Sequence, residues 1–516
     1  MLIRWLAAVS LFLAAAPALA QNYAVSSPNK LLTATISLNG EGRANYRVER
    51  DGKPLIADSQ LGFLFTDQPQ MLRNFAVVGQ RTRDHDATWE QPWGEQRYIR
   101  DHYRELSIDL EEKSALKRRM TIEVRMYDDG VGFRYRLPAR AGGAATNIAE
   151  ELTQFRVAAD GRAYWAPAFE SNREEYLYND TPVSGIGTAQ TPLTMVLADG
   201  THVSIHEAGL VDYSGMNVAR VEGTALKAVL TPSSSGPKVS RTGALTTPWR
   251  MLTIASDAPS LYAARNLILN LNEPNKLGDV SWVTPRKYVG IWWGMHLETQ
   301  SWASGPKHGA TTANALKLID FAAKNKIAGM LVEGWNVGWD GDWFANGQAF
   351  SFTKPYPDFD LPRIAAYAKK KGVALIGHHE TSANIAHYEA QMGAGFDYFR
   401  ANGIDAVKTG YVSDAGGVQA LGADGKISFE WHEGQVMARH HVKVVEEASK
   451  RRITINAHEP IKDSGLRRTY PNMVSREGQR GMEYNAWAVP KIRPFMTPNC
   501  SLLGCWQGRW ILLRES

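Results

Sequence analysis

Three glutamates, Glu459, Glu477 and Glu483, fall within residues 453–484, a segment rich in Gly, Pro and Arg that lacks a regular apolar period. Carboxylates in such a segment act as general acids or bases, bind a divalent cation, or pair with surface cations. Arginines that would serve as such partners are also frequent here, at Arg467, Arg468, Arg476 and Arg480. The segment alone leaves all three interpretations open.

The elements that must position these carboxylates are predicted by alternating apolar runs and amphipathic stretches after Pro285. Short buried strands are expected near 287–296, 327–336, 373–381, 404–414 and 452–460, and helices at 311–326, 361–372 and 432–451. Strand and helix at this spacing indicate parallel β/α units. Barrels built from such units carry their active sites at the carboxyl ends of the strands. At these positions this chain has polar or aromatic residues: Trp335–Asn336, His379–Glu380, Tyr411 and His458–Glu459.

The first half of the chain has a different pattern. From Asn22 to about Ser281, short runs alternate apolar and polar residues and are separated by Gly, Asp and Pro. Asp51–Gly52 and Asp129–Gly130 have the composition of hairpin turns. This half is predicted to form a large antiparallel β-sandwich.

Composition and termini limit the class of protein. At 516 residues, with 44% hydrophobic and 22% charged residues, the chain is expected to form more than one globular domain. The net charge of +5 is scattered, which gives no electrostatic case for binding nucleic acid. Residues 1–20 combine Arg4, an apolar run and an Ala-Leu-Ala end, which predicts a cleaved signal peptide and export, most simply to a Gram-negative periplasm.

No other apolar stretch is long enough to predict a membrane span. The two cysteines, Cys500 and Cys505, lie in the last seventeen residues, so disulfides are not expected to stabilise the fold. The oligomeric state does not follow from the sequence.

Four motifs in order, LVEGWNVGW, HHETSANIAHYE, NAHEPIKDSGLRRTYPN and EGQRGMEY, resemble glycoside hydrolase family 97, whose members are exo-acting α-glucosidases and α-galactosidases. The resemblance extends from about residue 22 to Trp487. It implies an N-terminal β-super-sandwich at 21–284 and a catalytic (β/α)8 barrel at 285–488. The chain is therefore expected to be a multidomain protein that combines an all-β domain with an α/β domain.

The resemblance also implies a mechanism. Retaining members carry an aspartate nucleophile in a Lys-x-Asp-Phe pattern, whereas this chain has Gly410 at that position in VKTGY. Inverting members carry glutamates after strands three and five, matched here by Glu380 and Glu459. These two are expected to act as general bases, and Glu483 as a general acid whose pKa is raised. Asp414 is the alternative, as a nucleophile in a retaining enzyme.

By the same matching, one Ca²⁺ is expected to bind Glu459, Glu477, Glu483 and a glutamate of the first domain, Glu175 or, failing that, Glu174. Clustered carboxylates suit this hard cation, which offsets their repulsion. Zinc is the alternative suggested by neighbouring histidines, but no His-Glu-x-x-His pattern is present. Substrate contacts are expected from five residues: Trp335, Trp339, His378, His379 and His458. Trp292 and Trp293 are further candidates, and packing of the barrel is the alternative role for all four tryptophans.

The tail at 489–516 departs from the family pattern. Shifting the reading frame of codons chosen for this tail recovers family motifs, so a frameshift is expected, with loss of the last barrel strands and a small C-terminal β-domain. The expected activity is calcium-dependent, inverting hydrolysis of terminal α-glucosidic bonds in maltooligosaccharides. A retaining α-galactosidase and an inactive carbohydrate-binding protein are the alternatives.

Overall fold

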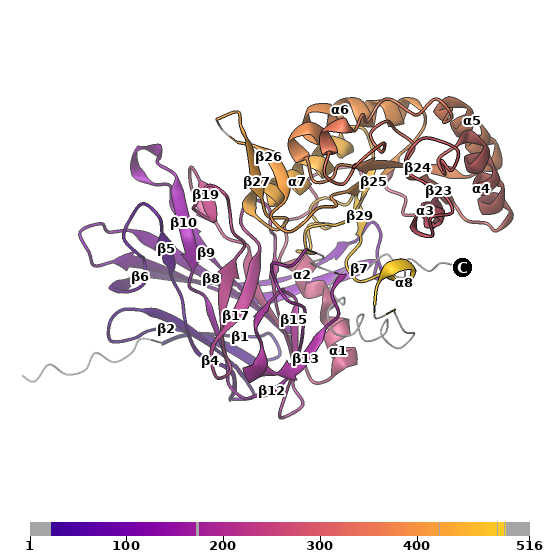
Figure 1. The fold of residues 1–516 in the computed structure, drawn as a ribbon. Helices are drawn as coiled ribbons and strands as arrows, with labels where there is room; N and C mark the ends of the chain where they lie inside the picture. Colours follow the sequence, from indigo (N-terminus) through magenta and orange to yellow (C-terminus); the bar gives the residue numbers. More distant parts are fainter. Residues whose placement is uncertain (1–21, 172–174, 423, 482, 490, 492–516) are drawn as a thin grey trace, which may run out of the picture.

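The computed structural model describes residues 22–171, 175–422, 424–481, 483–489 and 491. An all-β domain comes first, and a domain with a parallel sheet and covering helices follows it (Figure 1). The predicted signal peptide at 1–20 and nearly all of the tail at 489–516 lie outside the described residues. Among the described residues, no helix has the length and apolar character needed to cross a membrane.

The first domain is built from antiparallel sheets, as predicted. One sheet has the order β1 (Asn22–Ser26), β2 (Leu32–Leu38), β3 (Ala44–Arg50), β4 (Lys53–Gln60), β11 (Gln154–Val157), β18 (Ala225–Leu230), β17 (Met216–Glu222), β14 (Thr188–Ala189). A larger sheet has the order β13 (Asn179–Pro182), β12 (Gly161–Trp165), β15 (Leu193–Leu197), β16 (His202–Ala208), β21 (Trp249–Ala255), β9 (Gly130–Leu137), β8 (Arg119–Tyr127), β7 (Tyr98–Glu112), β6 (Phe75–Glu90), with β20 (Leu245–Thr246) beside β9.

A small third sheet contains β19 (Val239–Arg241), β10 (Thr146–Glu151) and β5 (Phe63–Phe65). The apolar faces of these sheets share one core, because alternate residues of each strand point to the same side. The predicted turn at Asp51–Gly52 is confirmed, with both residues at positive φ as a type I′ hairpin requires. The second hairpin is also present, but its turn is Asp128–Asp129, one residue earlier than expected.

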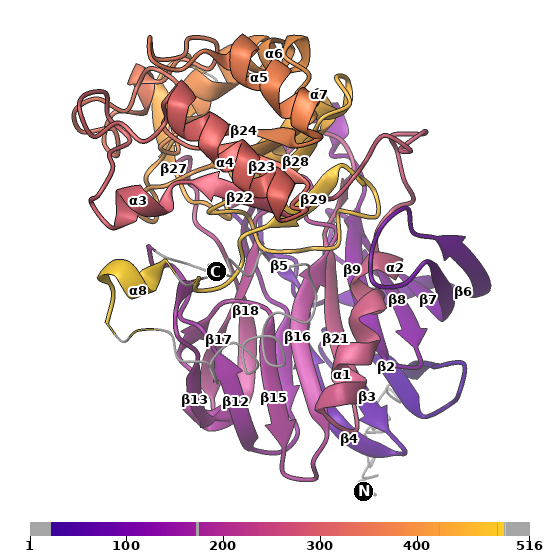
Figure 2. The ribbon, with the colours of Figure 1, turned by 90° about the vertical axis from the view of Figure 1, so that its right-hand side faces the viewer.

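The second domain contains the predicted strand–helix alternation. Its six strands all pair in parallel, in the order β22 (Tyr288–Ile291), β23 (Gly329–Val332), β24 (Ala374–Glu380), β25 (Ala406–Gly410), β28 (Thr454–Ala457), β29 (Met473–Arg476). Four helices cover them (Figure 2): α4 (Thr312–Lys324), α5 (Leu361–Lys371), α6 (Ile385–Ala401) and α7 (Gln435–Ser449). Six strands are found in the described part of the chain, and their assignment to a (β/α)8 barrel that lacks its last strands stays a prediction.

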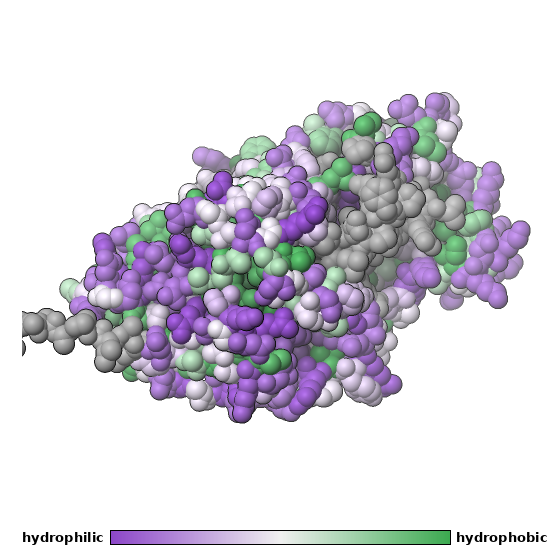
Figure 3. All heavy atoms as spheres, turned by 90° about the horizontal axis from the view of Figure 1, so that it is seen from below, coloured by the Kyte–Doolittle hydropathy of each residue, from purple (hydrophilic) through white to green (hydrophobic). Residues whose placement is uncertain are grey.

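Shorter elements complete both domains. In the first domain, α1 (Ala258–Ala263) and α2 (Leu267–Asn270) follow β21. The second domain contains α3 (Trp293–His296), α8 (Tyr484–Trp487) and the hairpin of β26 (Val418–Leu421) and β27 (Ile427–Glu430). The predicted domain boundary at 284–285 falls between α2 and β22. Hydrophilic residues predominate on the face shown in Figure 3, where hydrophobic side chains form small scattered groups.

Local sequence signals fix where the helices of the second domain begin and end. Asp360 caps α5 by accepting a hydrogen bond from the Arg363 amide, and Gly372 ends that helix in the left-handed conformation. Asn384 caps α6 in the same way. The Asn384 cap lets α6 begin close to the preceding strand: β24 ends at Glu380, and α6 begins five residues later.

Candidate active site

One cavity of about 350 Å³ collects most of the predicted site residues. Every strand of the parallel sheet contributes to it at or just beyond its carboxyl end: Trp292, Glu333, Glu380, Val412, His458 and Glu477. The N-terminal domain supplies Ser171 and Glu175, and the segment around α8 supplies Glu483 and Tyr484. Its size is that of a small-ligand site, and it lies where β/α sheets carry their chemistry.

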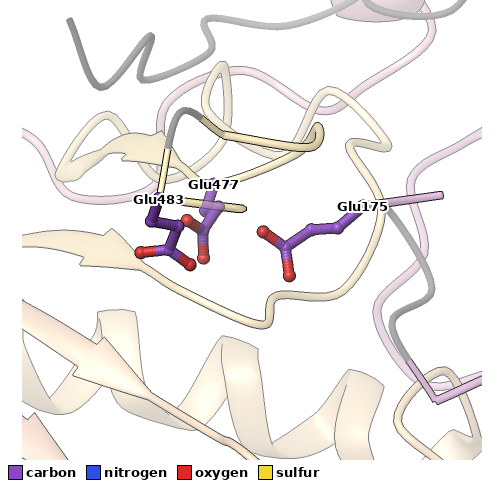
Figure 4. A group of neighbouring side chains, drawn as sticks. All are labelled: Glu175, Glu477 and Glu483. Atoms are coloured by element: carbon purple, nitrogen blue, oxygen red, sulfur yellow. The ribbon is translucent and has the colours of Figure 1, made fainter. Parts of the chain in front are cut away.

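Glu175, Glu477 and Glu483 form a cluster in this cavity. One oxygen of each carboxylate lies within 4.8 Å of one oxygen of the other two. Figure 4 shows Glu175, from the N-terminal domain, directed toward the other two. Tyr484 Oη donates a hydrogen bond of 2.8 Å to Glu175 Oε2. Three convergent carboxylates suit Ca²⁺, so these residues fit the predicted ion.

Two other predicted ligands fall outside this cluster. Glu459 lines the same cavity, but the cluster found among the described residues does not include it. Glu174, the alternative to Glu175, lies outside the described residues. The histidines suggested for zinc form no such cluster in the described part of the chain.

The charges of this cluster act on one another. Burial raises the pKa of Glu477 to about 8, and the neighbouring charge of Glu483 adds to the rise. Burial also raises the pKa of Glu483, but the hydrogen bond and charge of His296 outweigh it and leave that pKa lowered. From the sequence, a raised pKa is expected for Glu483, whereas in the structure this pKa is lowered. The cause is His296, whose Nε2 lies 3.5 Å from Glu483 Oε2.

A second pair of carboxylates lies at the ends of β24 and β28. Glu380 Oε1 accepts hydrogen bonds from the amides of Thr381, Ser382 and Val412, at 3.0, 2.7 and 3.3 Å. Glu459 Oε2 accepts a bond of 2.8 Å from the Tyr411 amide. Consecutive backbone N–H groups of one loop therefore hold the two predicted bases.

The environment of this pair favours a protonated Glu380. Burial raises the pKa of Glu380 to about 8, the charge of Glu459 adds to the rise, and the Ser382 amide opposes it. Glu459 has a φ of 43°, a left-handed conformation that is strained for a glutamate. Such strain is common where a side chain is held for function.

The cavity also holds a buried ion pair that the sequence analysis did not identify. Lys408 Nζ lies 2.6 Å from Glu333 Oε1, and Trp302 Nε1 donates to Glu333 Oε2 at 3.2 Å. Burial raises the pKa of Glu333, but the charge of Lys408 and its hydrogen bond to the carboxylate bring that pKa to about 2. A charged pair in this position offers both donors and acceptors to hydroxyl groups of a ligand.

His378, His458 and Trp339 line the cavity, as predicted. Burial lowers the pKa of His378 to about 3 and that of His458 well below its ordinary value, so both rings are neutral. His458 Nδ1 lies 2.9 Å from Glu477 Oε2. His458 therefore orients one of the clustered glutamates.

His379 and Trp335, also predicted to contact substrate, are instead packed in the core. His379 is fully buried against Phe399, with ring centroids 4.7 Å apart. Successive strand residues point to opposite faces, so His378 and His379 cannot both face the cavity. Trp335 stacks on Tyr398 and donates its indole N–H to the His378 carbonyl. The packing alternative holds for Trp335, whereas Trp292 lines the cavity.

Asp414, the alternative nucleophile, lies on the cavity rim. Ser171 Oγ donates to Asp414 Oδ1 at 3.4 Å, across the domain interface. The parallel register places Gly410, not Asp414, opposite Glu380. Asp414 therefore lies in the loop beyond the strand end.

Sequence and structure comparisons identify relatives. Residues 25–274 match the family model "Glycosyl-hydrolase 97 N-terminal", and residues 292–479 match "Glycoside hydrolase 97". A retaining alpha-galactosidase of Bacteroides thetaiotaomicron is 23% identical over 517 residues, covering 92% of this chain and 69% of that protein. A probable retaining alpha-galactosidase of Streptomyces bingchenggensis is 24% identical, and the chain spans 62% of its length and 86% of its own.

Solved structures give higher identity. A glycoside hydrolase family 97 enzyme from Pseudoalteromonas sp. strain K8, in complex with acarbose, has a TM-score of 0.92 and 43% identity over 95% of this chain and 74% of that one. A variant of that enzyme in complex with panose has a TM-score of 0.92 and 42% identity over 96% and 75% of the two chains. A beta-arabinopyranosidase with 19% identity, over 90% and 71% of the two chains, and a TM-score of 0.71 shares the fold.

Proposed function

The chain belongs to glycoside hydrolase family 97, and we propose that it is a calcium-dependent exo-α-glucosidase that cleaves non-reducing terminal α-glucosidic bonds with inversion. The observation that carries this proposal is the relation between Glu380 and Gly410. A Cβ at position 410 would stand 2.0 Å from Glu380 Oε2, so the strand end holds no side chain that acts as a nucleophile. Glu380 occupies that space instead.

The geometry supports a division of roles. Glu380 and Glu459, held by adjacent amides, would orient a water molecule, and the ionised member of the pair would accept its proton. Glu483, on the segment before α8, would give its proton to the glycosidic oxygen, once bound substrate excludes water and raises the pKa that His296 lowers. Inversion requires room for that water, with the acid and the base carboxyl groups roughly 6.5–9.5 Å apart.

Glu175, Glu477 and Glu483 would hold the calcium ion, with Glu459 as a further ligand. Bound there, Ca²⁺ would offset the repulsion among these carboxylates and fix the position of the acid. Glu333, Lys408, His378 and His458 would contact hydroxyl groups of the terminal sugar, since all four line the cavity and carry polar atoms.

The choice of a glucoside rests on the ligands of the more similar relatives. Acarbose and panose, bound to the Pseudoalteromonas enzyme and its variant, are both built on α-linked glucose-type rings. The names of the curated relatives favour a retaining α-galactosidase, but at 23% and 24% identity. Gly410 at the strand end weighs against that alternative. An inactive binding protein is disfavoured because the five glutamates proposed for catalysis and calcium binding all line one cavity.

Hydrolysis of p-nitrophenyl α-glucoside and α-galactoside, with and without Ca²⁺, tests substrate and cation together. Proton NMR of the glucose first released from p-nitrophenyl α-glucoside tests stereochemistry: β-glucose supports inversion, and α-glucose refutes it. A Glu483→Gln variant serves as the inactive control.

Export to the periplasm is part of the proposal, on the basis of the charged and apolar pattern of residues 1–20. A mature protein that begins at Gln21 in the periplasmic fraction would support it. A mature protein that keeps Met1 would refute it.

A further inference from the structure

We propose that Trp302, Trp343 and Phe344 form an aromatic wall that binds the leaving saccharide, so that the enzyme prefers oligosaccharides to substrates with a small leaving group. This inference rests on the proposed function. All three residues line the active-site cavity. None of them was identified from the sequence.

The aromatic wall is continuous with the deep part of the cavity. Trp302 and Trp339 are stacked, with centroids 6.1 Å apart and planes 13° apart. Trp343 packs against both, at 4.9 Å from Trp339 and 6.1 Å from Trp302, and Phe344 lies 6.1 Å beyond Trp343. The rings therefore form a continuous series from Trp339, deep in the cavity, to Phe344 at its mouth.

Burial shows which end of this series faces solvent. Trp339 is 2% exposed, whereas Phe344 is 44% exposed. A large apolar ring held at the mouth of a polar cavity gains free energy when another apolar face covers it. The faces of pyranose rings carry C–H groups, which makes a saccharide a suitable partner.

His296 places the aromatic wall on the leaving-group side. Its Nε2 lies 3.5 Å from Glu483 Oε2, and its ring meets Trp302 edge-on at 5.2 Å. Glu483 is the proposed acid, which must lie beside the glycosidic oxygen that it protonates. The saccharide attached to that oxygen therefore begins near His296 and extends along Trp302.

The loops that carry the aromatic wall are braced. The amide and hydroxyl of Ser304 both donate to Asp340 Oδ1, at 2.8 Å, which joins the Trp302 loop to the Trp343 loop. Ser382 Oγ donates to the Trp343 carbonyl at 2.7 Å. Because the rings are held before substrate arrives, little ordering entropy opposes binding.

The test compares a long and a short substrate. In Phe344→Ala, kcat/KM for maltotetraose should fall about tenfold, which corresponds to about 1.4 kcal/mol. For p-nitrophenyl α-glucoside, the value should change by less than about twofold, since its leaving group is a single ring that would meet Trp302 but not extend to Phe344. Phe321→Ala, at a similarly exposed ring on α4, is the matched control and should change neither value.

Binding provides a second measurement. In a Glu483→Gln background, Phe344→Ala should weaken maltotetraose binding but leave glucose binding unchanged, and Phe344→Trp should restore maltotetraose binding. Equal losses for both substrates, or no loss for either, would overturn the aromatic wall while the proposed function stands. If the unaltered enzyme hydrolyses neither α-glucoside, the proposed function fails, and this inference fails with it.

Discussion

Gly410 lies directly opposite Glu380 in the parallel pairing of β24 and β25, at the point where both strands end. The absence of a side chain at 410 is what lets the Glu380 carboxylate reach the amides of Ser382 and Val412. A side chain at 410 would therefore force the Glu380 carboxylate to leave its present position. The residues at 380 and 410 on these neighbouring strands together favour a general base over a nucleophile at this site.

Gly410→Ala should lower kcat by roughly a hundredfold, comparable to the loss of a positioned base. The added methyl group would displace Glu380 from its three backbone donors. Steady-state kinetics on p-nitrophenyl α-glucoside measure the effect, and Gly40→Ala, where a Cβ meets nothing within 4 Å, is the control.

The same substitution in a Glu380→Ala background should cause little further loss, because two changes that act through one carboxylate are not additive. A Gly410→Ala enzyme with full activity would show that the position of the Glu380 carboxylate does not depend on the glycine at 410.

Calcium should bind the folded protein and stabilise it. At a calcium concentration about 100 times the dissociation constant, the free energy of unfolding should rise by roughly 2.7 kcal/mol. Thermal unfolding with EDTA and with added Ca²⁺ measures this change, independently of activity. Glu477→Gln should abolish it, whereas Glu273→Gln, at an exposed glutamate, should not. An equal calcium effect in the Glu477→Gln variant would contradict the site.

Sequence alone predicted the strand–helix alternation of the second domain and the gathering of its glutamates at strand ends. Both follow from local patterns: buried strands are continuous apolar runs, and the polar residues that follow them share one edge of a parallel sheet. Glu380, Glu459 and Glu477 meet for that reason.

The facing of individual side chains was not predictable in the same way. His378 and His379 are chemically identical, and only the pleat of β24 decides that one meets the cavity and the other meets Phe399. The Glu333–Lys408 pair joins two strands that are far apart in sequence. Glu333 lies in the LVEGWNVGW motif and Lys408 in VKTGY, so both residues could have been identified as candidates. Their pairing follows only from the three-dimensional structure.

The contribution of Glu380 to the free energy of unfolding should fall as pH rises, in EDTA, between about 4.5 and 8. Burial and Glu459 raise the pKa of Glu380 from 4.5 to about 8 in the folded state. The folded protein therefore binds a proton that the unfolded chain releases, and this contribution is lost as pH rises through the folded pKa. At about 1.4 kcal/mol per unit, the loss is at most roughly 5 kcal/mol.

Urea unfolding at pH 5 and at pH 8.5 measures this slope, which Glu380→Gln should reduce. Glu389→Gln is the control, because the pKa of Glu389 is shifted in the opposite direction. The hydrogen bond from His440 outweighs burial and holds the pKa of Glu389 at about 2. Its contribution is present above the unfolded pKa and is lost only as pH falls toward 2, so this variant should leave the slope above pH 5 unchanged. A slope unaffected by Glu380→Gln would contradict the buried, protonated carboxyl.

Lys462 should be needed to join the two domains. Its Nζ lies 3.1 Å from Glu433 Oε2 and 3.4 Å from Glu207 Oε1, and Glu207 is also bound by the fully buried Arg250. Lys462→Met would leave these carboxylates short of one cation in a buried interface, which typically costs about 3–5 kcal/mol. Urea unfolding measures the change.

Lys426→Met, which removes an exposed pair with Asp424, should change stability by less than about 1 kcal/mol. If the Lys462 effect arises from uncompensated charge, adding Glu433→Gln should recover part of the lost stability, because one of the two carboxylates is then neutral. Recovery is not expected if Lys462 acts only through packing of its aliphatic chain. Since Glu459 precedes Lys462 by three residues, the same interface holds the segment that carries a proposed base in place.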